Sequence, residues 1–194
     1  MKVGIGYDVH RFDGKGPIKL GGATIPFSRG LSGHSDADVL LHALTDALLG
    51  AIGAPDIGEQ FPSSDPRYRQ ADSRVFLEAA CAQVRRQGFV VGNVDATVIA
   101  DEPRLTGYKT QMSRAISRLL QVSPSQVSVK AKTTEHFCPG KAGIAAQAVV
   151  LLMQARIVPR RRATKAGTPP SGGVADGSAA DRRSRPPTKR RKAA

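Results

Sequence analysis

The sequence predicts an α+β protein with a mixed β-sheet and helices packed mainly on one face of that sheet. Short runs of small and branched apolar residues alternate with segments that repeat apolar residues at helical spacing. Strands and helices therefore interleave along the chain, and turn-forming residues separate them. The apolar patterning fades after residue 153, which predicts one folded domain over residues 1–157 and a distinct segment over residues 158–194.

The first part of the domain begins with a strand. Residues 2–9 (KVGIGYDV) alternate small and branched side chains, and a short second strand is expected near residues 18–21. Ser35 followed by Asp38 resembles a capping box, so we expect Ser35 to be the N-cap of a helix. Apolar residues at helical spacing over residues 39–48 predict that helix.

The rest of the domain continues the alternation. Residues 56–66 (DIGEQFPSSDP) are dense in turn formers and predict a loop that is long enough to carry function. The other expected elements are helices over residues 72–87 and 110–120, and strands over residues 89–100, 127–132 and 143–153.

The net charge of +13 is concentrated at the end of the chain. Residues 156–194 hold 12 Lys/Arg against 2 Asp, whereas residues 1–155 hold 17 Lys/Arg against 14 Asp/Glu. Residues 158–194 also lack apolar periodicity and cannot bury enough surface to offset their chain entropy, so we expect them to be disordered. They form either a solvated extension, which we favour, or a weak arm for nucleic acid and other polyanions.

The composition favours a cytoplasmic protein. No apolar run has the length of a membrane span, and polar residues near the N-terminus interrupt any signal-peptide core. The two cysteines, Cys81 and Cys138, do not make a disulfide framework and suit a reducing compartment.

Asp8, His10 and His42 are candidate metal ligands. Asp8 and His10 lie two residues apart on the first predicted strand, so their side chains share a face, and we expect the residue between them to point into the core. With His42 from the first helix they give three nitrogen and oxygen ligands, as in a catalytic zinc site with one open position. Alternatively, Asp8 and His10 form a surface ion pair and His42 is a hydrogen-bonded core histidine. Asp38 or Asp46 could accept a hydrogen bond from the His42 ring.

Two other segments suit a phosphorylated ligand. His34 and Ser35 precede a helix N-terminus, where free backbone N–H groups favour anions, although a plain helix cap would look similar. Residues 130–135 (KAKTTE) offer ammonium groups and hydroxyls for phosphate oxygens, and a glutamate for a hard divalent cation. Threonines also favour strands for purely structural reasons. The residues alone thus predict a small enzyme that uses a metal ion in phosphoryl chemistry.

In order along the chain, these motifs resemble the 2-C-methyl-D-erythritol 2,4-cyclodiphosphate synthase family. The resemblance rests on G-x-D-x-H around residue 8, H-S-D-x-D-V-x-x-H-A-L-x-D-A-L-L-G over 34–50 and D-I-G-x-x-F-P over 56–62. Residues 71–73, 92–95 and 130–135 extend the match in register, so that it covers about residues 1–155.

The resemblance implies a lyase of the non-mevalonate route to isoprenoids. Such enzymes convert 4-diphosphocytidyl-2-C-methyl-D-erythritol 2-phosphate into the cyclic diphosphate and CMP. They are homotrimers with each active site between two subunits. By resemblance, Asp8, His10 and His42 bind zinc, and Glu135 helps to hold magnesium or manganese.

The resemblance also implies roles for individual residues. His34 and Thr133 position and stabilise the phosphorus that the substrate's own 2-phosphate attacks, while Asp8 and His10 also contact the substrate. The other implied substrate-binding residues are Ser35, Asp56, Ile57, Gly58, Phe61, Pro62, Asp65, Ala100, Pro103, Arg104, Leu105, Ala131, Lys132, Thr134, Glu135 and Lys141. Asp56, Ile57 and Gly58 hold the erythritol part. The family builds its cytidine pocket from the positions of Ala100, Pro103, Arg104, Leu105, Ala131 and Lys132.

One loop departs from the family pattern. The run over residues 136–143 is about two residues shorter than the usual loop, and Lys141 replaces an arginine, which keeps the charge but loses the bidentate fork. Two rival readings remain: a nucleic-acid-associated protein that acts through its basic end, and a structural trimer whose active site has decayed. Zinc in the purified protein would favour the enzyme over both.

Overall fold

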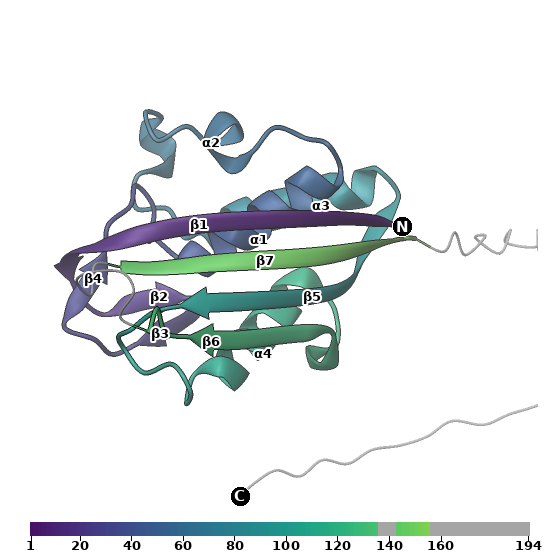
Figure 1. Cartoon of the computed structure of the whole chain (residues 1–194). Helices are drawn as coiled ribbons and strands as arrows, with labels where there is room; N and C mark the ends of the chain where they lie inside the picture. Colours follow the sequence, from purple (N-terminus) through teal and green to yellow (C-terminus); the bar gives the residue numbers. More distant parts are fainter. Residues whose placement is uncertain (136–142, 156–194) are drawn as a thin grey trace, which may run out of the picture. The chain divides into compact units, whose positions relative to one another are not determined.

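The computed structural model describes residues 1–135 and 143–155, which contain a five-stranded mixed sheet (Figure 1). The sheet has the order β4-β1-β7-β5-β6. Its strands are β1 (Lys2–Lys15), β4 (Arg29–Leu31), β5 (Phe89–Ile99), β6 (Val127–Lys132) and β7 (Gly143–Gln154). The β5–β6 pair is parallel and the other pairs are antiparallel. A separate two-stranded hairpin joins β2 (Ile18–Leu20) to β3 (Ala23–Ile25).

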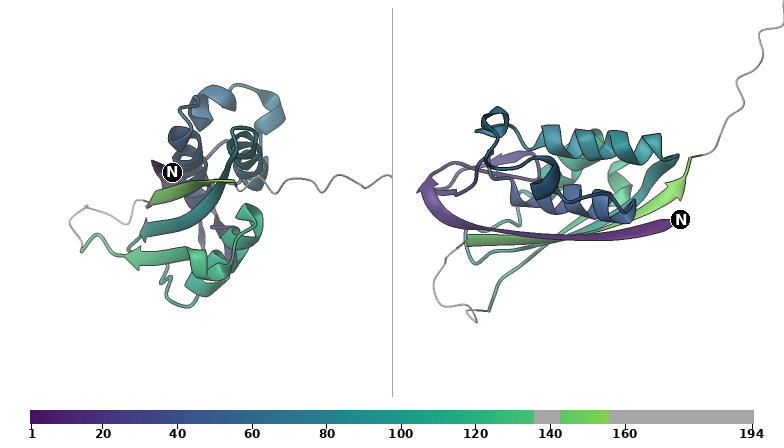
Figure 2. Two further views of the ribbon diagram at one scale, coloured as in Figure 1. Left: turned by 90° about the vertical axis from the view of Figure 1, so that its right-hand side faces the viewer. Right: turned by 90° about the horizontal axis from the view of Figure 1, so that it is seen from above.

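The three long helices cover one face of the sheet (Figure 2). They are α1 (Val39–Ala51), α3 (Arg74–Arg86) and α4 (Lys109–Leu120). The apolar core lies between the helices and the sheet, and α1 is buried on nearly all sides because it packs against β1, β7 and α3. The predicted fold class, a mixed sheet with helices mainly on one face, is confirmed.

Short helices interrupt the segment that was expected to be a loop. The structure has α2 (Ile57–Gln60) and a 3-10 helix over Pro66–Tyr68, and another 3-10 helix over Pro124–Gln126 precedes β6. Asp56 caps α2 by accepting a hydrogen bond from Glu59 N–H, and Asp65 caps the 3-10 helix through Arg67 N–H. The turn formers in this segment therefore act as N-caps of short helical turns.

Two glycines allow α1 to pack closely on β1. A Cβ atom on Gly4 would lie 1.9 Å from the backbone oxygen of Ala47, and one on Gly6 would lie 1.9 Å from that of Ala43. Both positions face the helix and have no room for a side chain. This close contact places the helix beside the part of β1 that carries Asp8 and His10.

The prediction that the residue between Asp8 and His10 points into the core is wrong. Val9 is 57% exposed, whereas both of its neighbours are partly buried on the helix-covered face. The face of β1 toward the helices carries Gly4 and Gly6 before Asp8, and its large apolar side chains occupy the opposite face.

The expected start of the first helix is also wrong. The N-cap is Asp38, which accepts a hydrogen bond from Leu41 N–H, and not Ser35. The buried Asp38 carboxylate also accepts hydrogen bonds from the backbone N–H groups of Gly21 and Gly22. It joins the β2–β3 turn to α1, and burial raises the pKa of its carboxyl.

Residues 158–194, which the sequence predicts to be a separate disordered segment, lie outside the described residues. The same holds for Cys138 and Lys141. None of the helices within residues 1–135 and 143–155 is long and apolar enough to cross a bilayer.

Candidate metal centre and active site

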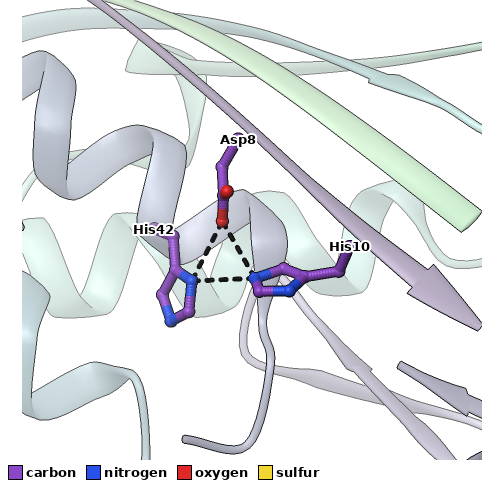
Figure 3. A group of neighbouring side chains, drawn as sticks. All are labelled: Asp8, His10 and His42. Atoms are coloured by element: carbon purple, nitrogen blue, oxygen red, sulfur yellow. Dashed lines mark hydrogen bonds and ion pairs between the residues drawn. The ribbon is translucent and has the colours of Figure 1, made fainter. Parts of the chain in front are cut away.

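Asp8, His10 and His42 converge on one point between β1 and α1 (Figure 3). Asp8 Oδ2 lies 3.0 Å from both His10 Nε2 and His42 Nδ1, and the two ring nitrogens are 3.1 Å apart. One carboxylate oxygen and two imidazole nitrogens form a donor set that suits a divalent transition metal. The side chains are 12–28% exposed, so the centre is partly shielded from water.

The charges at this centre favour a cation. Burial raises the pKa of Asp8, but the adjacent imidazole rings of His10 and His42 outweigh burial and hold that pKa well below its usual range. Burial lowers the pKa of His10, but the bond to Asp8 outweighs it and the pKa of His10 is raised. The carboxylate of Asp8 thus makes this centre favourable for positive charge.

A cavity of about 290 Å³ opens beside His10 and His42. Its lining comes from β1, α1, α2 and α3, from the loop before α1 and from the segment between α2 and α3. Its other lining residues are Gly33, His34, Ser35, Ile57, Gly58, Phe61, Pro62, Ser63, Tyr68 and Phe76. The sequence had singled out six of these as substrate-binding: His34, Ser35, Ile57, Gly58, Phe61 and Pro62.

Hydrogen bonds and aromatic contacts hold the cavity wall in place. Ile57 N–H donates to Asp46 Oδ1 over 2.8 Å, which fixes the start of α2 to α1. The rings of Phe61, Tyr68 and Phe76 pack against one another with centroids 4.9–5.7 Å apart. The side chain of Asp65 caps the Pro66–Tyr68 turn and pairs with exposed Arg67.

Most of the other predicted substrate-binding residues lie at the ends of β5 and β6 or just after them in the chain, and we call this group the second cluster. Ala100 N–H donates to Lys132 O, and Thr134 donates to Asp101 through both its backbone N–H and its hydroxyl. Thr133 Oγ1 donates to Glu135 Oε1 over 2.6 Å. This group includes Ala100, Pro103, Arg104, Leu105, Ala131, Lys132, Thr133, Thr134 and Glu135.

The two clusters come from strands that do not adjoin in the sheet, but His10 of the first and Thr134 and Asp101 of the second line a common cavity of about 350 Å³. Strands β7 and β5 lie between β1 and β6, which places β1 and β6 about 14 Å apart at the usual strand spacing. Glu135 accordingly does not belong to the Asp8–His10–His42 group in the described part of the chain.

Neither Asp38 nor Asp46, the two acceptors considered from the sequence, binds the second ring nitrogen of His42. The carboxylates of Asp38 and Asp46 bind backbone N–H groups instead. The His42 Nε2 atom lies 2.8 Å from Ser73 Oγ and 3.1 Å from Ser35 Oγ. Ser73, Tyr68 and Asp101 were all missed as candidate residues, because only tertiary contacts bring them to the two clusters.

The YgbB family model matches residues 1–153 of this sequence. The chain belongs to the YgbB family. A 2-C-methyl-D-erythritol 2,4-cyclodiphosphate synthase from Geobacillus thermodenitrificans is 51% identical over 156 residues, which cover 79% of this chain and 98% of that one. The family predicted from the sequence motifs is confirmed.

Two solved structures extend this likeness of the YgbB chain to the fold. A 2C-methyl-D-erythritol-2,4-cyclodiphosphate synthase in a CDP-bound form has a TM-score of 0.73 and 38% identity, over 78% of this chain and all of that one. The bifunctional IspDF from Campylobacter jejuni has a TM-score of 0.75 and 40% identity, over 79% of this chain. The match spans only 42% of that bifunctional protein.

Proposed function

We propose that this chain converts 4-diphosphocytidyl-2-C-methyl-D-erythritol 2-phosphate into 2-C-methyl-D-erythritol 2,4-cyclodiphosphate and CMP. The reaction is an intramolecular phosphoryl transfer in non-mevalonate isoprenoid biosynthesis, catalysed by a lyase. The observation that carries the proposal is the Asp8–His10–His42 cluster, whose donor atoms all lie within 4.8 Å of one another beside a cavity, in a chain of the YgbB family. Formation of CMP from that substrate is the direct test.

Asp8, His10 and His42 would hold zinc, since their donor set matches a three-ligand zinc centre. A magnesium or manganese ion would be held in part by Glu135, whose carboxylate is exposed at the end of β6. The bound cations supply positive charge beside the diphosphate.

The protein needs no nucleophilic side chain, because the attacking group is the 2-phosphate of the substrate itself. Catalysis then consists mainly of positioning and of stabilising negative charge. His34 would contact the reacting phosphate from the cavity wall, and Thr133 would do so through its hydroxyl. Asp56, Ile57 and Gly58 would bind the erythritol part at the start of α2.

Replacing Thr133 with alanine is expected to lower kcat on the order of 100-fold and to raise KM much less. A hydroxyl that contacts the reacting phosphate stabilises the transition state more than the bound substrate. Steady-state kinetics measure the two constants. Thr24→Ala is the matched control, since the exposed Thr24 hydroxyl only accepts a bond from Lys19. A change in KM alone would assign Thr133 to substrate binding.

We also propose that the chain acts as a homotrimer with active sites shared between subunits. The order of the sheet supports this, because β7 and β5 lie between β1 and the strand that leads to Thr133, and a neighbouring chain could bring its Thr133 region to the metal centre. The uncovered face of the sheet supports it too. Val3, Ile5, Tyr7 and Val9 of β1 are 57–65% exposed, and Val149 of β7 adjoins Ile5 on the same face. An apolar patch of this kind is typical of an interface.

Replacing Ile5 with lysine is expected to convert the trimer to monomers and to abolish activity, because it places a charge within the apolar interface. Light scattering measures the mass, and CMP release the activity. Val75→Lys is the control: Val75 is a similarly exposed aliphatic residue on α3, away from the sheet face. An unchanged mass for Ile5→Lys would show that this face is not the interface.

We assign residues 158–194 to a solvated basic extension that contributes no site residue, and the protein to the cytoplasm. The concentration of charge in that segment supports weak polyanion binding as its additional property. The metal centre and the sheet lie within residues 1–155.

A further inference from the structure

The two nitrogens of the His42 ring face different surroundings. Nδ1 points to the metal centre, where it lies 3.0 Å from Asp8 Oδ2. Nε2 points away from the centre, 2.8 Å from Ser73 Oγ and 3.1 Å from Ser35 Oγ. Ser73 is fully buried at the start of α3, so water does not compete for its hydroxyl.

The hydrogen bonds of Ser73 have a fixed direction. Its hydroxyl donates to Asp36 Oδ1 over 2.5 Å, and a carboxylate can only accept. The single hydroxyl proton is therefore committed to Asp36, and the lone pairs of Ser73 Oγ are left to accept from His42 Nε2 and from the Ser35 hydroxyl, 3.2 Å away. The result is a chain of donors that runs from His42 through Ser73 to Asp36.

This direction decides which nitrogen of His42 can bind a cation. With the proton on Nε2, the lone pair of Nδ1 points to Asp8 and His10, as a metal ligand requires. His10 is held in a corresponding way: its Nδ1 lies 2.6 Å from the carbonyl oxygen of Ser32, which can only accept, so Nε2 faces the centre.

The position of Ser73 supports a role beyond helix capping. It is the N-cap residue of α3, and serine is among the best N-caps, yet its side chain makes no capping hydrogen bond. Its hydroxyl binds Asp36 and His42 instead. Asp36 Oδ1 also accepts a bond from Ser73 N–H, and Asp36 N–H donates to Ala71 O. These bonds fasten the loop that carries Asp36 to the start of α3.

We propose that Ser73, oriented by Asp36, is a positioning residue that holds His42 in the Nε2–H tautomer and thereby prepares Nδ1 for the cation. Ser73 belongs neither to the Asp8–His10–His42 cluster nor to the lining of the cavity beside it. The inference deepens the proposed function, since it rests on the metal centre that this function requires.

The test compares wild-type protein with Ser73→Ala in two measurements. Competition with a chromophoric chelator gives the zinc affinity, which is expected to fall about 10- to 100-fold in the variant. Long-range ¹H–¹⁵N NMR of the metal-free, ¹⁵N-histidine-labelled protein gives the tautomer of His42. We expect Nε2–H in wild type and a mixture of tautomers in the variant. Ser117→Ala is the matched control, since Ser117 is a buried serine on α4 whose hydroxyl donates to Arg114 O.

Each outcome has a distinct meaning. A lower zinc affinity with a mixed tautomer in Ser73→Ala, and neither change in Ser117→Ala, is the result that we expect. Unchanged affinity and tautomer in Ser73→Ala would overturn the positioning role while leaving the metal centre intact. Failure of the wild-type protein to bind zinc would count against the proposed function, whereas the tautomer of the metal-free protein would still decide the role of Ser73.

Discussion

Replacing His42 with alanine is expected to remove nearly all bound zinc and nearly all CMP release while the fold is retained. A three-ligand centre loses its geometry when one ligand is deleted, so the metal affinity should fall by more than about 100-fold. Alanine is the best helix former, and the side chain lost from α1 borders an open cavity, so the fold should tolerate the change. Elemental analysis measures the zinc, and circular dichroism the fold.

His34→Ala is the matched control for this prediction. His34 lines the same cavity but does not belong to the ligand cluster, so the variant should keep its zinc and lose turnover. Full zinc occupancy in purified His42→Ala would refute the metal assignment.

Replacing Gly6 with alanine is expected to destabilise the domain by about 3 kcal/mol or more. The new Cβ would lie 1.9 Å from Ala43 O and 2.7 Å from Ala47 N, and neither backbone atom can move without shifting α1. Because that shift would also separate His42 from Asp8, zinc affinity should fall together with stability. Urea unfolding followed by circular dichroism measures the change.

Gly50→Ala is the control for Gly6→Ala, because Gly50 lies in α1, the helix that packs on Gly6. Its Cβ would have no neighbour closer than 3.9 Å, and alanine favours a helix over glycine by roughly 0.5–1 kcal/mol. This variant is therefore expected to be slightly stabilised. Equal stability of Gly6→Ala and wild type would show that α1 does not depend on the glycines of β1 for its position.

The sequence predicted the fold class and nearly every long element, but it misassigned the faces of β1. In the run KVGIGYDV the apolar side chains alternate with glycines, and large apolar residues ordinarily face the core. Here α1 approaches so closely that only glycine fits at positions 4 and 6 of the core face, and the large apolar residues lie on the outer face. A single chain's pattern does not distinguish a core face from an interface face.

The cluster of Asp8, His10 and His42 could be predicted because Asp8 and His10 share one face of a strand and the spacing of the motifs is distinctive. The hydrogen bonds that orient His42 could not be predicted. Ser73 at the start of a helix looks like an ordinary N-cap. Its hydroxyl binds Asp36 and His42 instead, and both residues are distant from it in the sequence. Ser35 and Asp38 are both good N-caps, and the β2–β3 turn, which also binds Asp38, decides between them.

Incubating the purified protein with 4-diphosphocytidyl-2-C-methyl-D-erythritol 2-phosphate and divalent metal, and following CMP by chromatography, tests the proposed function most directly. CMP and the cyclic diphosphate should form in equal amounts. Both should disappear when a chelator removes the cations and return when zinc and magnesium are restored. Metal-loaded, folded protein that releases no CMP would contradict the proposal and leave a structural role for the domain.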